Sequence, residues 1–187
     1  MPTDHLTSPS QIIFPDSCRQ EMINHCRRKL AREFIEGEAQ ELKAFGLLAG
    51  NREGDRIQVG RCLPLLRNVR SQLPHRQFMD EIMTAHAIPS ITPLDRRGWV
   101  ADPAELMEKV RDCHQNHFTL VGTYHMHRVA WPDDATRDTP TTLDMILGQE
   151  SRLIMFIVSM VSPKLPIIRA FSEGRPDREI PIFFEDS

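Results

Sequence analysis

The sequence lacks an apolar run long enough to cross a membrane. The longest such run, around Leu153 to Val161, has the length of a buried strand. Residues 1–10 are polar and lack the apolar centre of a secretory signal. The net charge of -3 gives no general attraction to nucleic acid or to an anionic membrane. We therefore expect neither nucleic acid nor a membrane among the partners of this protein.

Paired cysteines, internal repeats and low-complexity segments are also absent. The four cysteines are scattered and form no Cys-x-x-Cys pair. This pattern predicts reduced thiols in a cytoplasmic protein. The 187 residues, of which 40% are hydrophobic, suffice for one domain with a substantial core. We expect a flexible tail over residues 1–11 and a single domain over residues 12–187, while the composition leaves the oligomeric state open.

Local patterns predict alternating helices and strands. Apolar spacing and capping residues predict helices over residues 16–36, 78–87 and 103–116, and a further helix that Thr139 caps and that begins at Pro140. Runs of apolar residues bounded by turn residues predict strands over residues 44–50, 56–66, 118–125, 152–161, 166–171 and 178–184. This order predicts an α/β fold in which helices sandwich a mixed β-sheet, and not a doubly wound fold.

The most informative segment is Tyr124-His125-Met126-His127, which follows an apolar run. Two histidines separated by one residue lie on the same side of a strand. Asp144 follows within the first turns of the next predicted helix, and Thr141 shares its helix face. Two imidazoles and a carboxylate leave a fourth position for water, which is the arrangement of a catalytic zinc ion. Such a water has its pKa lowered toward neutrality and can attack a carbonyl.

An ordered series of segments resembles the JAMM/MPN+ metalloproteases, which include deubiquitinating isopeptidases and free-standing bacterial members. The matching segments cover most of the chain and are Phe45 to Gly50, Leu63 to Leu65 with Asn68, Asp102-Pro103, Val121 to His127, Phe156 to Ser159, Ile168 to Phe171 and Glu179 to Ile182. The resemblance implies a fold of the MPN (cytidine-deaminase-like) type, with zinc as the cofactor.

The sequence departs from the family signature beside the metal strand. Met126 stands where the family has a small hydroxyl residue, and Arg128 stands in place of a proline. The family spacing places the third ligand at Asp138, but the form Ser/Thr-x-x-Asp occurs six residues later and ends at Asp144. We favour Asp144 over Asp138 because its helix-start context is right. Residues 129–138 would then lengthen the loop beside the metal and carry Trp131 over it.

The second departure concerns the catalytic glutamate. The family places it three residues before Gly46, where this chain has Lys43. A lysine is normally protonated at neutral pH and cannot accept a proton from water. Glu41 lies two residues earlier on the same predicted strand face and is our candidate for the base, although a surface carboxylate is an equal alternative. Thr141 is our candidate for the donor that stabilises the oxyanion.

The resemblance implies a zinc-dependent metallopeptidase or isopeptidase. Its implied substrate is an extended tail, such as that of a ubiquitin-like or sulfur-carrier protein, which could add to a sheet edge. Two alternatives stay open at this point. The protein could be a metal-binding MPN scaffold with little or no hydrolysis, which Lys43 favours. It could also be a zinc hydrolase of a small-molecule amide, in which the long loop closes over the substrate.

Overall fold

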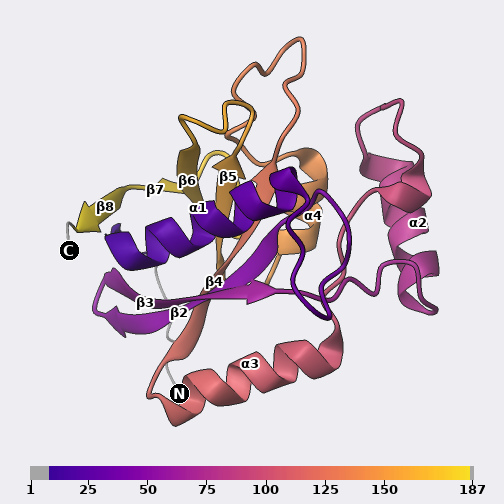
Figure 1. Cartoon of the computed structure of the whole chain (residues 1–187). Coiled ribbons are helices and arrows are strands. Elements are labelled where there is room, and N and C mark those ends of the chain that lie inside the picture. The colour runs from indigo at the N-terminus through magenta and orange to yellow at the C-terminus, as the bar shows by residue number, and fades with distance from the viewer. Residues whose placement is uncertain (1–8, 186–187) are drawn as a thin grey trace, which may run out of the picture.

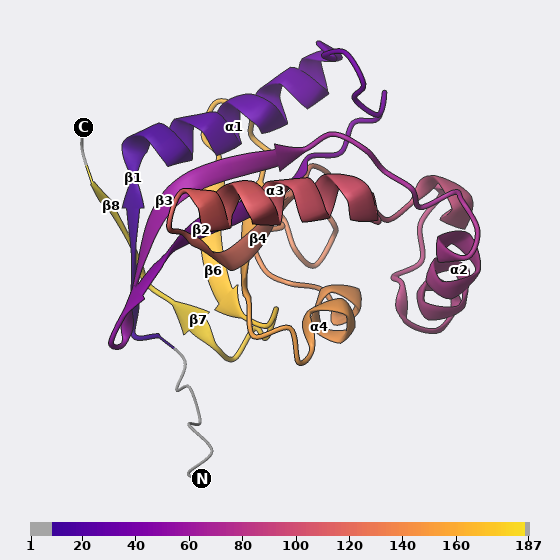
Figure 2. The ribbon, with the colours of Figure 1, turned by 90° about the horizontal axis from the view of Figure 1, so that it is seen from below.

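The computed structural model describes residues 9–185, and it contains one eight-stranded sheet with helices on both faces (Figures 1 and 2). Residues 1–8 of the tail predicted over residues 1–11 lie outside the described residues. The helices are α1 (Asp16–Ala31), α2 (His75–His86), α3 (Pro103–Gln115) and α4 (Thr142–Gly148), with a short 3-10 helix at Leu94–Arg96. The strands are β1 (Gln11–Pro15), β2 (Phe45–Glu53), β3 (Arg56–Leu65), β4 (Thr119–His127), β5 (Ile154–Ser159), β6 (Ile167–Ser172), β7 (Glu179–Ile180) and β8 (Ile182–Glu185).

The sheet is mixed and strongly curled. Its strand order is β7-β6-β5-β4-β2-β3-β1-β8, so β7 and β8 form its two edges. Only Pro181 separates these two strands along the chain. The carbonyl of Pro181 accepts a hydrogen bond of 3.0 Å from the backbone N–H of Ile12 in β1. The two edges of the sheet therefore come together at Pro181.

The two faces of the sheet carry separate cores. Leu48 and Tyr124 are fully buried on the face that α1 covers, together with Met22 from that helix. Leu47 packs on the opposite face with Cys113 of α3. Successive residues of a strand point to opposite sides, so this alternation explains how one sheet supports two cores. The predicted mixed sheet with helices on both faces is thus present.

Strand β4 lies in the middle of the sheet and carries the two histidines. It pairs antiparallel with β2 and parallel with β5. A Cβ atom at Gly46 would lie 2.2 Å from the ring of Tyr124, so only glycine fits at that position. The hydroxyl of Tyr124 lies 2.8 Å from Nδ1 of His25 on α1. These contacts fix β4 between its neighbours.

Several predicted element boundaries are wrong. Helix α1 ends at Ala31 and not at residue 36, because Arg32 adopts the left-handed conformation with φ of 61°. The N-cap of α1 is Pro15, which gives no side-chain cap. Helix α4 is capped by Thr141 and not by Thr139. The predicted last strand is divided at Pro181 into β7 and β8.

Strand β1 is absent from the predicted elements, because we placed Gln11 in the flexible tail and predicted no element over residues 12–15. Burial alternates along it, and Ile12 and Phe14 are both fully buried. They are buried because β1 pairs in parallel with both β3 and β8, which are distant in the sequence. No local signal could reveal these long-range partners.

The predicted state of the cysteines agrees with the structure. All four are buried free thiols: Cys18, Cys26, Cys62 and Cys113. Over residues 9–185, no helix is both long enough and apolar enough to cross a membrane.

Candidate metal centre

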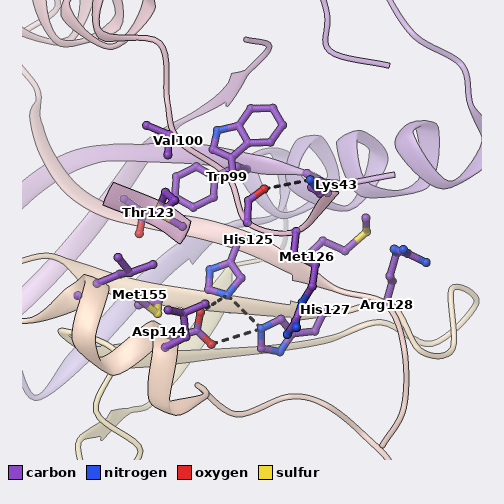
Figure 3. Close-up of a pocket in the computed structure, with 18 of the residues that line it drawn as sticks. Lys43, Trp99, Val100, Thr123, His125, Met126, His127, Arg128, Asp144 and Met155 are labelled. Carbon is purple, nitrogen blue, oxygen red and sulfur yellow. Dashed lines mark hydrogen bonds and ion pairs between the residues drawn. The ribbon is translucent and has the colours of Figure 1, made fainter. Parts of the chain in front are cut away.

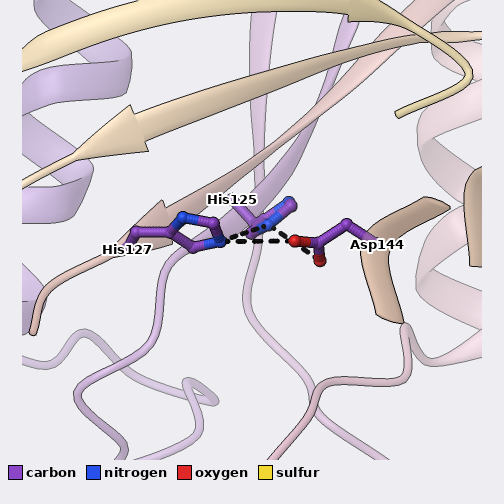
Figure 4. Close-up of side chains that lie close together, drawn as sticks. All are labelled: His125, His127 and Asp144. Carbon is purple, nitrogen blue, oxygen red and sulfur yellow. Dashed lines mark hydrogen bonds and ion pairs between the residues drawn. The ribbon is translucent and has the colours of Figure 1, made fainter. Parts of the chain in front are cut away.

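Three side chains meet at the carboxyl end of β4 (Figure 4). The Nε2 atoms of His125 and His127 lie 3.1 Å apart. One carboxylate oxygen of Asp144, Oδ1, lies 3.3 Å from Nε2 of His125, and Oδ2 lies 3.5 Å from Nε2 of His127. The strand alternation predicted for the two histidines therefore brings both rings to one point, where Asp144 faces them.

Helix α4 holds Asp144 in place through a capping box. The hydroxyl of Thr141 accepts a hydrogen bond of 3.2 Å from the backbone N–H of Asp144. In return, Oδ2 of Asp144 accepts one of 2.7 Å from the backbone N–H of Thr141. These reciprocal bonds satisfy two donors at the helix start and fix the carboxylate. Thr141 thus acts as the N-cap, and it is not among the residues that line the adjoining cavity.

The orientation of His127 is set by a backbone carbonyl. Nδ1 of His127 lies 3.0 Å from the carbonyl oxygen of Arg137. A carbonyl can only accept, so Nδ1 carries the proton and Nε2 of the neutral ring keeps its lone pair. Burial lowers the pKa of His127 despite its contact with Asp144, which keeps the ring neutral. His127 thus offers an unprotonated nitrogen to the other two side chains.

The carboxyl of Asp144 is ionised. Burial by itself raises the pKa of Asp144, but the charge of His125 and the hydrogen bond from its ring outweigh burial and hold this pKa well below its usual range. The lone pair of His127 Nε2 therefore faces a carboxylate oxygen at 3.5 Å with no proton between them. Two acceptors that face each other in a buried place favour a cation between them.

The three donors fit a zinc ion. Zinc binds imidazole nitrogen and carboxylate oxygen at about 2.0–2.2 Å, and tetrahedral geometry then separates neighbouring ligand atoms by about 3.3–3.5 Å. The two Nε2 atoms lie 3.1 Å apart, and each faces a different oxygen of the Asp144 carboxylate, at 3.3 and 3.5 Å. One ligand atom from each of the three side chains lies within 4.8 Å of the others, so the three groups are close enough to share one ion. The carbonyl of Arg137 supplies the outer contact that histidine ligands commonly make.

A cavity of about 650 Å³ opens beside the three side chains (Figure 3). The ring of Phe45 stacks against the ring of His125 at 6.0 Å and against Trp99 at 6.2 Å. Leu143 and Leu147 of α4 and Phe78 and Met79 of α2 add further apolar surface to the lining. The volume is within the range of small-molecule sites.

The candidate base, Glu41, does not reach this cavity. It lies in a bend before β2 and not on the strand, so the alternation that we assumed does not apply. Its carboxylate accepts a hydrogen bond of 3.0 Å from Nδ2 of Asn68 and pairs with Nζ of Lys43 at 2.5 Å. Lys43 itself lines the cavity, and its Nζ donates to the carbonyl of Gly98 at 3.0 Å.

The other candidate ligand, Asp138, lies outside the group of three. Its carboxylate accepts a hydrogen bond of 3.0 Å from the hydroxyl of Thr136 and one of 3.3 Å from Arg169. The long loop does place Trp131 in the cavity wall. Arg137 in the same loop was missed, because its contact with His127 goes through its backbone and leaves no mark in the side-chain pattern.

Comparisons with known proteins add information about the fold only. No protein-family profile matches the chain, and no curated protein matches it. Among solved structures, it is similar to the solution structure of protein DSY2949 from Desulfitobacterium hafniense, with a TM-score of 0.61 and 24% sequence identity. The match covers 94% of both chains. The chain therefore shares a mixed α/β fold with that bacterial protein over nearly its whole length.

Proposed function

We propose that this protein is a zinc-dependent hydrolase of amide bonds, a metallopeptidase or isopeptidase of the JAMM/MPN type. The observation that carries the proposal is the convergence of His125, His127 and Asp144 at separations that suit zinc. The segments that resemble the family also occur in the family's order, which supports an MPN-type arrangement. Zinc held by these three side chains would polarise a carbonyl and lower the pKa of a bound water toward neutrality.

The residues around the three ligands suit the binding of an amide substrate. The carbonyl of Arg137 holds His127 in the tautomer that presents a lone pair. Phe45 and Trp99 form an apolar wall beside His125, which would exclude water and seat an apolar side chain. Strand β4 is central in the sheet, so a substrate would enter the cavity and would not add to a sheet edge. A short peptide end, including the tail of a ubiquitin-like or sulfur-carrier protein, suits this access.

Proton transfer is expected to limit the rate of hydrolysis at this site. Amide hydrolysis needs a group that takes a proton from water and passes it to the leaving amine. Among the described residues that line the cavity, only Asp144 and Glu173 carry carboxylates. Asp144 is engaged with the histidines, and Glu173 accepts a hydrogen bond of 2.9 Å from the backbone N–H of Arg152. Lys43 occupies the place of the family glutamate, so we expect slow hydrolysis.

The same observation favours a second candidate function. A metal-binding scaffold could bind a peptide tail without hydrolysing it, and such a scaffold needs no proton acceptor. Lys43 would then serve to bind and not to react. The two functions make different predictions for a protein in which a carboxylate returns to position 43.

The experiment is to restore that carboxylate. Lys43→Glu is combined with Glu41→Gln, which removes the like charge two residues away. We expect elemental analysis to find about one zinc per chain in both the wild type and this double variant. Cleavage of a panel of N-acyl amino acids and short peptides should be faster in the double variant by roughly a hundredfold to ten-thousandfold.

Two control variants accompany this test. Lys43→Gln with Glu41→Gln removes the lysine charge without adding a carboxylate, and it should stay as slow as the wild type. His125→Ala in the faster variant should abolish cleavage. A wild-type protein that takes up no zinc at micromolar concentration would contradict the metal site. A zinc-loaded double variant without any cleavage would favour the scaffold.

A further inference from the structure

The cavity beside the candidate metal centre carries an excess of positive charge. Its lining includes five cationic side chains: Lys43, Arg96, Arg97, Arg128 and Arg137. The two carboxylates in the lining, those of Asp144 and Glu173, already accept hydrogen bonds within the protein. Lys43 is balanced by Glu41, which lies outside the lining. Arg137 pairs with Asp134, which also lies outside the lining. Cationic side chains therefore outnumber carboxylates in the lining itself, which attracts an anion.

Arg137 is the buried member of this set. Its side chain is only 8% exposed. Its guanidinium pairs with the carboxylate of Asp134, through Nη1 at 3.4 Å. Its Nε is buried and has no hydrogen-bond partner among the described residues. An unpaired N–H on a buried guanidinium is unfavourable, so an acceptor that enters the cavity would satisfy it.

The loop holds this guanidinium in a fixed position. The charged group lies over the ring of Trp131, with Cζ at 3.2 Å from the ring centre. The backbone N–H of Arg137 donates to Oδ1 of Asp134 at 2.7 Å, and its carbonyl accepts from His127. Its φ of 51° is in the left-handed region, where a residue other than glycine is strained. One residue therefore both orients a candidate metal ligand and presents a planar cation to the cavity.

From these contacts we infer that Arg137 forms a carboxylate-binding subsite, and that the ligand of this cavity is an amide that also carries a carboxylate. A guanidinium presents parallel N–H groups whose spacing matches the two oxygens of a carboxylate. The apolar wall of Phe45 and Trp99 suits a hydrophobic part of the same molecule. That the ligand is an amide rests on the proposed function, whereas the carboxylate subsite does not.

The test uses pairs of ligands that differ only in the carboxylate. N-acetyl-leucine is compared with N-acetyl-leucinamide, which presents the same apolar side chain without the charge. N-acetyl-glutamate α-amide is compared with N-acetyl-glutamine α-amide, so that a chain-end carboxylate can be told from one on a side chain. The two tryptophans of the chain, Trp99 and Trp131, both line the cavity, so their fluorescence reports binding directly.

Binding is measured on metal-free and on zinc-loaded protein. We expect the acid of at least one pair to bind at least tenfold more tightly than its amide, with and without zinc. Arg137→Gln should remove this preference. Arg111→Gln, which removes the same charge from an exposed position of α3, should keep it. Arg137→Lys, which keeps the charge but not the planar group, should keep only part of it.

Equal binding of acid and amide by the metal-free wild type would overturn the inference, whatever the variants do. A preference that survives Arg137→Gln would also overturn it. A preference that appears only with zinc and does not depend on Arg137 would place the carboxylate on the metal instead. Circular dichroism and zinc content of Arg137→Gln show whether the variant is folded. Absence of zinc binding or of hydrolysis would contradict the proposed function and leave the metal-free result standing.

Discussion

Neighbouring residues of β4 face two different environments. Tyr124 is fully buried under α1 and contacts His25, whereas His125 points to the other side of the sheet and faces Asp144 (Figure 3). This alternation could be predicted from the sequence, because the period of a strand is two. The position of Glu41 could not, because the chain bends before β2 begins at Phe45.

The third ligand is testable by one pair of substitutions. Asp144→Ala should weaken zinc binding by more than about a hundredfold, because loss of an outer contact alone commonly costs about tenfold to a hundredfold. Asp138→Ala should leave zinc binding nearly unchanged, since its carboxylate pairs with Arg169. Competition with a chelator of known affinity measures both. The reverse ranking would show that the spacing of the JAMM family holds in this chain.

Helices differ in how well the sequence predicts them. Helix α3 begins where Asp102 and Pro103 predict, and Asp102 accepts the expected hydrogen bond from the backbone N–H of Glu105 at 2.8 Å. Helix α4 has only seven residues and begins two residues later than predicted. The Thr139-Pro140 pair resembles a helix start, but the reciprocal hydrogen bonds of Thr141 and Asp144 place the start two residues later.

Two substitutions can separate the helix-capping role of Thr141 from any other role of its hydroxyl. Thr141→Ala should destabilise the protein by about 1 kcal/mol, because it removes the acceptor for the backbone N–H of Asp144. Zinc binding should weaken with it, since the cap positions the carboxylate. Thr141→Asn, an equally good cap without a hydroxyl, should restore both quantities in urea unfolding and zinc titration. Rescue by Thr141→Ser but not by Thr141→Asn would assign a separate role to the hydroxyl.

The curled sheet encloses charged groups as well as apolar ones. His25, Lys29 and Glu38 are each less than 10% exposed on the α1 side. Arg28 binds Glu38 through both terminal nitrogens, at 2.5 and 2.9 Å, and Nζ of Lys29 donates to the carbonyl of Ala39 at 2.5 Å. Burial lowers the pKa of His25 from 6.5 to about 4, even though Glu38 lies nearby.

This buried histidine makes stability depend on pH. Between pH 6.5 and about 4, the unfolded chain takes up a proton that the folded protein does not. The contribution of His25 is therefore full above pH 6.5 and is lost on acidification, by about 2 kcal/mol between pH 7.5 and pH 5. Glu38, whose pKa is lowered to about 2 despite its burial because Arg28 binds its carboxylate, adds a further loss only below pH 4.5.

Urea unfolding of metal-free protein at pH 7.5 and pH 5 measures this loss without a contribution from zinc. His25→Gln keeps a polar partner for Tyr124, but glutamine does not titrate. Between pH 7.5 and pH 5, the free energy of unfolding of this variant should therefore fall by about 2 kcal/mol less than that of the wild type. His86→Gln, at an exposed position of α2, should behave as the wild type does. An equal fall in His25→Gln would show that another group titrates.

The meeting of β1 and β8 has a consequence for synthesis on the ribosome. Ile12 pairs with Ile182, and Phe14 contacts Phe184 with ring centres 5.9 Å apart. During translation, Ile12 of β1 is synthesised 170 residues before Ile182, its pairing partner in β8. Until then one edge of β1 stays open, as strand edges that promote aggregation do. The sheet can be completed only after β8 has left the exit tunnel, so we expect the partly synthesised chain to aggregate more readily than the folded protein.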